Sequence, residues 1–155
     1  MMMNLSSNVI ATLCGKILVT AESCTGGGIG AALTAVPGSS KVYKGGIISY
    51  ANEVKINQLH VPAELLDRVG AVSAEVAESM AVGARTALSA DIAISVTGLA
   101  GPDGDEFENP VGTVFVGYAD QNGVCSQKFQ FVGDRDSIRN QATEAALYLI
   151  LQMQQ

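Results

Sequence analysis

The sequence is poor in the side chains on which several common kinds of functional site depend. Its 155 residues include one histidine, three cysteines and no tryptophan, with nine lysines and arginines against fifteen aspartates and glutamates. The formal net charge is −6 at pH 7, and no two basic residues are adjacent. A face that binds nucleic acid needs clustered basic side chains. We therefore expect no nucleic-acid partner.

Long apolar runs are also missing. No stretch of about 20 residues is apolar enough to cross a membrane. Residues 1–8 lack the charged and then apolar build of a secretory signal peptide. We therefore expect a cytoplasmic protein with no membrane partner. A chain of this length buries roughly 70% of its unfolded surface, so residues 1–155 are expected to form one domain without metal or disulfide.

The scarcity of histidine and cysteine limits the chemistry. A serine-histidine-aspartate triad would have to use His60, and a zinc site would need His60 together with the three cysteines, which offer no closely spaced ligand pair. His60 stands two residues before Pro62, where we expect it to end a helix and face solvent. If the protein is a hydrolase, its general base is expected to be another residue.

The hydrophobic pattern alternates between helical and strand periods. Helices are expected over residues 4–15, 29–36, 52–59, 62–69, 73–88 and 134–153, with 62–69 the weakest. Strands are expected over residues 16–21, 45–50, 91–97, 112–119 and 125–132. The Asn122-Gly123 pair favours a hairpin between the last two strands. This order predicts a three-layer α/β/α domain with a mixed sheet of about five strands.

The segment 22–28 (ESCTGGG) joins a predicted strand to a predicted helix. A hydroxyl at such a junction lies near unpaired helix N–H groups, which can stabilise an oxyanion or bind phosphate. Ser23 is then a candidate nucleophile, although Ser23 or Thr25 can equally serve as a helix cap. Cys24 is either an activated thiol or, as is more frequent, a buried and inert one.

Tyr50 and Lys55 lie at the end of a predicted strand and in the first turn of the next helix, so both can face one cavity. Lysine is an alternative base for a serine nucleophile. At its ordinary pKa, lysine is neutral about one time in a thousand at pH 7. Lowering the pKa to roughly 7.5 takes about 4 kcal/mol of desolvation or like-charge repulsion, which an apolar pocket and a nearby arginine can supply. A solvated lysine is the alternative.

Two further segments carry polar residues. The glycines of the loop 98–110 let backbone N–H groups approach a ligand, and its acidic residues lack the spacing of a calcium loop, so we expect no metal; a plain surface loop is the alternative. Arg135 and Arg139 fall on one face of the last helix. They are suited either to gripping a phosphate or to pairing with Asp134 and Asp136.

Taken together, six segments resemble the CinA C-terminal domain family, in order and over nearly the whole chain: 21–27 (AESCTGG), 37–40 (PGSS), 50–55 (YANEVK), 70–73 (GAVS), 97–102 (TGLAGP) and 110–113 (PVGT). The resemblance implies an amidohydrolase that converts nicotinamide mononucleotide (NMN) to nicotinate mononucleotide and ammonia in pyridine nucleotide recycling. It also implies a homodimer, and no cofactor is expected. In competence/damage-inducible proteins this domain follows a larger N-terminal domain, which these 155 residues do not contain.

By resemblance, Ser23 is the nucleophile, Lys55 the base and Tyr50 its partner. The implied mononucleotide pocket is lined by Thr25, Gly26, Gly27, Thr97, Gly98, Ala100, Gly101 and Arg135 or Arg139. Two positions depart from the family pattern, Asp103 in place of glycine and Ala51 in place of serine. Asp103 and its acidic neighbours place negative charge beside the phosphate pocket. They motivate an alternative, a nucleotide-binding regulatory protein without turnover.

Overall fold

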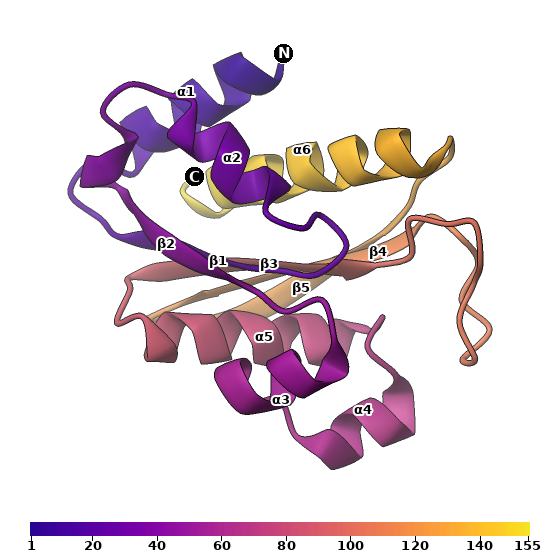
Figure 1. The fold of residues 1–155 in the computed structure, drawn as a ribbon. Helices are drawn as coiled ribbons and strands as arrows, with labels where there is room; N and C mark the ends of the chain where they lie inside the picture. The colour runs from indigo at the N-terminus through magenta and orange to yellow at the C-terminus, as the bar shows by residue number, and fades with distance from the viewer.

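The structure is a computed structural model that describes residues 1–155. A five-stranded sheet lies between two layers of helices (Figure 1), and its strand order is β2-β1-β3-β4-β5. The strands are β1 (Leu18–Glu22), β2 (Tyr43–Ile48), β3 (Ile92–Gly98), β4 (Thr113–Asp120) and β5 (Gly123–Gln130). Strand β1 pairs in parallel with β2 and β3, whereas β3, β4 and β5 pair antiparallel. The predicted three-layer architecture with a mixed sheet is confirmed.

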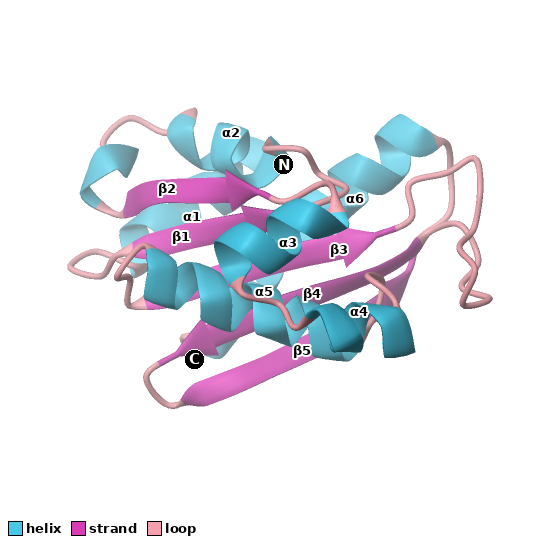
Figure 2. Ribbon diagram, turned by 60° about the horizontal axis from the view of Figure 1, so that its bottom comes forward, coloured by secondary structure: helices cyan, strands magenta, loops and turns pink.

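Three helices cover each face of the sheet (Figure 2). On one face lie α1 (Met2–Thr12), α2 (Gly28–Thr34) and α6 (Arg135–Met153), with a 3-10 turn at Ser39–Lys41. On the other lie α3 (Asn52–Leu59), α4 (Ala63–Val69) and α5 (Ala74–Ala87). A hydrophobic cluster fills the space on each side of the sheet. None of the helices combines the length and the apolar character needed to cross a membrane.

Side-chain caps begin the two longest helices, at the first residues of the predicted ranges 73–88 and 134–153. Ser73 accepts a hydrogen bond from the N–H of Val76 at the start of α5, and Asp134 accepts one from Ser137 at the start of α6. Within α5, a Cβ added at Gly83 would stand 1.9 Å from the carbonyl oxygen of Leu59. Only glycine therefore allows α3 to pack so closely on α5.

Some predicted boundaries are wrong by a few residues. Strand β2 ends at Ile48 and not at residue 50, because its pairing with β1 runs out where Glu22 meets Ile48. Ser49 and Tyr50 therefore belong to the turn before α3. Strand β5 occupies 123–130 and not 125–132, because the hairpin turn contains only residues 121–122.

The carboxyl ends of β2, β1 and β3 meet at one edge of the sheet. The chain leaves β1 toward α2 on one face and leaves β2 toward α3 on the opposite face (Figure 1). Such a divergence between neighbouring strands is where open α/β sheets bind ligands. The Ser23 N–H donates to the backbone carbonyl of Val96 at 3.0 Å, and the Ser49 N–H donates to the backbone carbonyl of Glu22 at 2.7 Å. These bonds attach Ser23 and Ser49, the residues directly after β1 and β2, to the neighbouring strands.

Candidate active site

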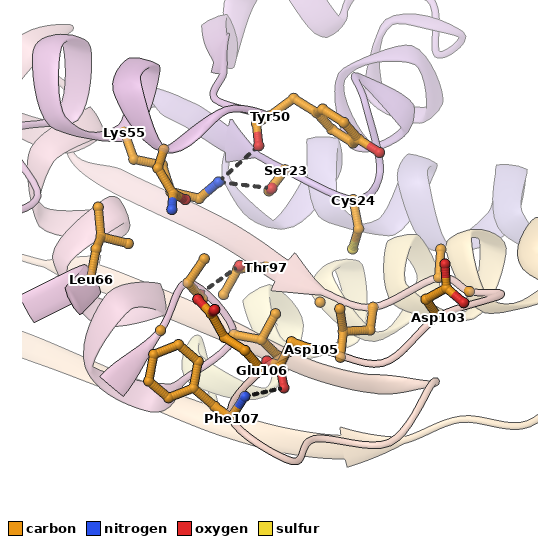
Figure 3. Close-up of a pocket in the computed structure, with 18 of the residues that line it drawn as sticks. Ser23, Cys24, Tyr50, Lys55, Leu66, Thr97, Asp103, Asp105, Glu106 and Phe107 are labelled. Atoms are coloured by element: carbon orange, nitrogen blue, oxygen red, sulfur yellow. Dashed lines mark hydrogen bonds between the residues drawn. The ribbon is translucent and has the colours of Figure 1, made fainter. Parts of the chain in front are cut away.

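A cavity of about 490 Å³ opens at this edge. Ser23 and Cys24 from the turn after β1 form part of its wall, and the loop after β3 forms another part (Figure 3). Its full lining is Ser23, Cys24, Tyr50, Asn52, Lys55, Leu66, Gly70, Ala71, Val72, Thr97, Gly98, Leu99, Ala100, Gly101, Pro102, Asp103, Asp105, Glu106, Phe107 and Arg135.

Lys55 and Ser23 meet in this cavity. The Lys55 Nζ lies 3.0 Å from the Ser23 Oγ, and the two side chains face each other in Figure 3. Both are buried, with Lys55 1% and Ser23 7% exposed. The same Nζ donates to the carbonyl oxygens of Ser49 at 2.6 Å and Tyr50 at 3.2 Å. All three partners of Lys55 are therefore uncharged oxygens.

Burial lowers the pKa of Lys55 from its ordinary value of 10.5 to about 8. At pH 7 about a tenth of the lysine is then neutral. A neutral amine has two N–H groups and one lone pair. With the N–H groups donated to the Ser49 and Tyr50 carbonyls, the lone pair is directed at the Ser23 hydroxyl. This arrangement suits Lys55 to remove the serine proton, and burial alone, without help from an arginine, supplies the shift.

The Tyr50 side chain contacts a different partner. Tyr50 is 63% exposed, and its hydroxyl accepts a hydrogen bond from Arg135 at 3.2 Å. Its ring points away from Lys55 in Figure 3, so only the Tyr50 backbone carbonyl reaches the lysine. The resemblance makes Tyr50 the partner of Lys55, but a proton relay through the Tyr50 hydroxyl does not match this geometry. The earlier end of β2 explains the difference, because it places Tyr50 in a turn.

The N-terminus of α2 is already occupied by a side chain of the protein. The Glu22 carboxylate accepts hydrogen bonds from the Thr25 hydroxyl and from the N–H groups of Gly27, Ile29 and Gly30. These helix amides are therefore not free to hold an oxyanion, contrary to the expectation from sequence. The N–H of Cys24, directly after Ser23, donates no hydrogen bond to another residue.

Arg135 and Arg139, which the sequence places on one helix face, contact different parts of the structure. Arg135 lines the cavity and also donates to the Gly101 carbonyl, whereas Arg139 does not reach the cavity. Arg139 donates to the carbonyls of Cys24 at 3.0 Å and Thr25 at 3.1 Å. Four residues of the predicted mononucleotide pocket lie outside the cavity lining: Thr25, Gly26, Gly27 and Arg139.

The end of β3 and the loop after it line the cavity where the sequence predicts it, through Thr97, Gly98, Ala100 and Gly101. The Thr97 hydroxyl fixes this loop by donating to the Ala71 carbonyl at 2.8 Å. Sequence reasoning did not assign six further lining residues to the site, because they come from distant parts of the chain: Asn52, Leu66, Gly70, Ala71, Val72 and Phe107. The GAVS segment was the signal for three of them, Gly70, Ala71 and Val72.

The acidic residues of this loop behave differently from one another. Asp105 accepts hydrogen bonds from the N–H groups of Phe107 and Asn109, so its charge is used inside the loop. Asp103 and Glu106 are exposed and line the cavity. No group of three or more histidine, cysteine, aspartate or glutamate side chains is arranged to hold a metal ion.

Cys24 is a buried thiol. It is 6% exposed, and burial raises its pKa to about 11. A thiol with this pKa holds almost no thiolate at neutral pH, and the thiolate is the nucleophilic form. Burial and the raised pKa favour the buried, inert thiol over the activated one.

The fold and the Ser23–Lys55 pair define an α/β protein with a serine–lysine site at the carboxyl edge of its sheet. Residues 4–154 match the model of the CinA C-terminal domain, and the chain belongs to this family.

Relatives of two lengths match the chain. A CinA-like protein from Geobacter sp. (strain M21) is 54% identical over 125 residues, which cover 81% of this chain but only 30% of that protein. The chain therefore spans less than a third of that relative. The nicotinamide-nucleotide amidohydrolase PncC of Pseudomonas putida is 49% identical over 136 residues, covering 88% of this chain and 85% of that protein.

Solved structures share the whole fold. A CinA superfamily protein from Klebsiella pneumoniae superimposes with a TM-score of 0.97 at 35% identity, covering 99% of this chain and 98% of that one. A competence/damage inducible protein from Agrobacterium tumefaciens superimposes with a TM-score of 0.95 at 37% identity, covering 99% of this chain and 96% of that one.

Proposed function

We propose that this protein is an amidohydrolase that removes ammonia from the carboxamide of NMN and yields nicotinate mononucleotide, a step of pyridine nucleotide recycling. The observation that carries the proposal is the 3.0 Å approach of the buried Lys55 Nζ to the Ser23 Oγ. The name of the Pseudomonas putida relative supports the substrate. The cavity volume of about 490 Å³ falls within the usual range for small-molecule sites.

In the proposed mechanism, neutral Lys55 takes the Ser23 proton while Oγ attacks the carboxamide carbon. The oxyanion of the tetrahedral intermediate is stabilised by the free N–H of Cys24, the residue after the nucleophile. The Lys55 ammonium then protonates the amine as the C–N bond breaks, which releases ammonia. Lys55 next deprotonates a water that attacks the acyl-serine, and proton return to Ser23 frees the carboxylate product.

The proposed phosphate ligand is Arg135. Its guanidinium lines the cavity, and its partners are a carbonyl and a phenol, both neutral. A phosphate offers a planar guanidinium a stronger, charge-assisted pairing than either of these. Arg139 is less suited to this role, because it lies outside the cavity lining and already donates to the Cys24 and Thr25 carbonyls.

Ammonia release from NMN tests this proposal. We expect Ser23→Ala and Lys55→Met to lower kcat at least about 10³-fold, since both belong to one proton-transfer unit. Ser40→Ala and Lys44→Met are matched controls, because both residues are exposed and lie outside the cavity. Wild-type turnover that persists in both site variants would overturn the mechanism.

The acidic lining favours a second candidate, a nucleotide-binding regulatory protein. Asp103, Asp105 and Glu106 oppose the phosphate of a mononucleotide at the same cavity. This function predicts that NMN raises the melting temperature without forming product. Multiple turnovers of NMN by the wild-type protein would exclude it.

A further inference from the structure

Glu22 is a buried carboxylate with an unusual set of partners. It is the last residue of β1, directly before Ser23, and is 2% exposed. Five donors surround its two oxygens, at 2.7 Å from the Thr25 hydroxyl, 2.9 Å from Ile29, 3.0 Å from Gly30, 3.2 Å from Gly27 and 3.3 Å from the Thr20 hydroxyl. None of these donors is a lysine or arginine.

Burying a carboxylate without a cation is costly unless its oxygens are well hydrogen-bonded. Here the donors come from β1, from the turn that follows Ser23 and from the first residues of α2. The carboxylate therefore connects the strand before the nucleophile to the helix after it. Arg139 holds the same turn from α6, through the carbonyls of Cys24 and Thr25. Glu22 thus holds the Thr25 hydroxyl and the Gly27 N–H of the turn, and Arg139 holds the carbonyls of Cys24 and Thr25.

This double attachment bears on the geometry of the reaction. The turn carries Ser23 Oγ, which must stay within hydrogen-bond reach of Lys55. It also carries the Cys24 N–H, which directly follows the nucleophile and donates to no other residue. Any added conformational freedom of the turn would move the Ser23 hydroxyl and the Cys24 N–H relative to Lys55. The Glu22 side chain does not line the cavity and cannot touch the substrate there.

We propose that Glu22 is a positioning residue, which holds the turn after β1 so that the Ser23 hydroxyl faces Lys55 and the Cys24 N–H faces the oxygen of the reacting carboxamide. This inference rests on the proposed function. It separates Glu22 from the reacting groups and predicts that its loss reduces the rate of the chemical step and leaves substrate binding intact.

Glu22→Gln is the sharpest variant, because it keeps the size of the side chain and replaces one oxygen by an NH₂ group. That group must face a donor from Gly30 or from Ile29, so one anchor of the turn is lost. A misplacement of about 1 Å can cost about 10²-fold in rate. We expect kcat to fall about 10- to 100-fold while KM stays within about twofold.

Thr25→Val is the second variant, since it removes the 2.7 Å hydroxyl donor and keeps the shape of the side chain. It is expected to lower kcat in the same direction by about three- to tenfold. Asp91→Asn is the matched control. Asp91 also accepts from a backbone N–H, that of Ile17 at 2.7 Å, but it stands before β3, at the opposite edge of the sheet.

The experiment measures steady-state kinetics with NMN, thermal unfolding, and the rate at which a fluorophosphonate labels Ser23. The labelling rate reports the reactivity of the serine without the substrate, and it is expected to fall with kcat in both variants but not in Asp91→Asn. If Glu22→Gln does not fold, Thr25→Val decides alone. An unchanged kcat and labelling rate, or a rise confined to KM, would overturn the inference. Wild-type protein that labels at Ser23 but releases no ammonia would overturn the proposed function instead, and the labelling rates would still decide the role of Glu22.

Discussion

The Ser23 Oγ and the Lys55 Nζ lie 3.0 Å apart, although 32 residues separate them in the sequence. They follow adjacent parallel strands, β1 and β2, whose chains leave the sheet in opposite directions. The two carbonyls that hold the lysine belong to the turn between β2 and its own helix. The lysine is thus oriented by backbone atoms, which no side-chain substitution removes.

The pH dependence of the reaction should follow the ionisation of Lys55. Only the neutral amine can accept the serine proton, and the pKa of Lys55 is about 8. We expect kcat/KM to rise about tenfold per pH unit below this value and to level off above it. A rate profile from pH 6 to about 9.5 checks this. A flat profile would contradict the assignment of Lys55 as the base.

The free energy of unfolding should also depend on the ionisation of Lys55. Folding lowers the pKa of Lys55 from 10.5 to about 8, so the unfolded chain binds more protons between these values. The penalty for a charged Lys55 is complete below about pH 8 and disappears as the pH rises toward the unfolded pKa. Relative to Lys55→Met, we expect the free energy of unfolding of the wild type to gain about 3 kcal/mol across this range. Urea unfolding of both proteins at several pH values measures the difference, and a constant difference would contradict the burial of a titrating lysine.

The Tyr50 hydroxyl should matter for binding more than for proton transfer. Its observed partner is Arg135, at 3.2 Å on the exposed side of the cavity. A hydrogen bond of this kind contributes about 0.5–1.5 kcal/mol. We expect Tyr50→Phe to raise KM about two- to tenfold and to leave the pH midpoint of kcat unchanged. A shifted midpoint would restore the proton relay.

Cys24 should be dispensable for chemistry. Its pKa of about 11 leaves little thiolate at pH 7. We expect Cys24→Ala to retain kcat within about threefold, the residual loss coming from a small packing defect. Iodoacetamide should label the exposed Cys14 well before Cys24 in the wild type. Loss of all activity in Cys24→Ala would instead indicate a thiol mechanism.

The acidic loop should weaken binding of an anionic substrate. We expect the double variant Asp103→Asn/Glu106→Gln to lower the KM for NMN about two- to fivefold at low salt, with a smaller effect at high salt because exposed charges are screened. Glu108→Gln is the matched control, since Glu108 belongs to the same loop but does not line the cavity. If the double variant raises KM, its carboxylates contact the substrate favourably.

Much of this site could be predicted from local sequence. The strand, turn and helix around Ser23 follow from a β-branched run and consecutive glycines, and α3 spans the predicted residues 52–59. With one histidine in the chain, located at the exposed end of α3, lysine is the base that sequence reasoning favours.

What sequence could not supply are directions and long-range contacts. The spacing of residues in the sequence does not show that the Glu22 carboxylate accepts hydrogen bonds from the first residues of α2. The direction of Tyr50 depends on where β2 stops pairing with β1, which is a property of the sheet. The contact between Thr97 and Ala71 joins segments 26 residues apart, which lie on either side of α5 in the sequence.

The carboxylate at the start of α2 also affects how a mononucleotide would lie in the cavity. In many α/β proteins the phosphate rests on the first helix, and the rest of the ligand extends away from it. Here that place is filled, and the cation that lines the cavity beyond Lys55 is Arg135, near the Gly101 side. We therefore expect the substrate to lie in the opposite orientation, with its carboxamide at the turn after β1 and its phosphate at Arg135, the first residue of α6.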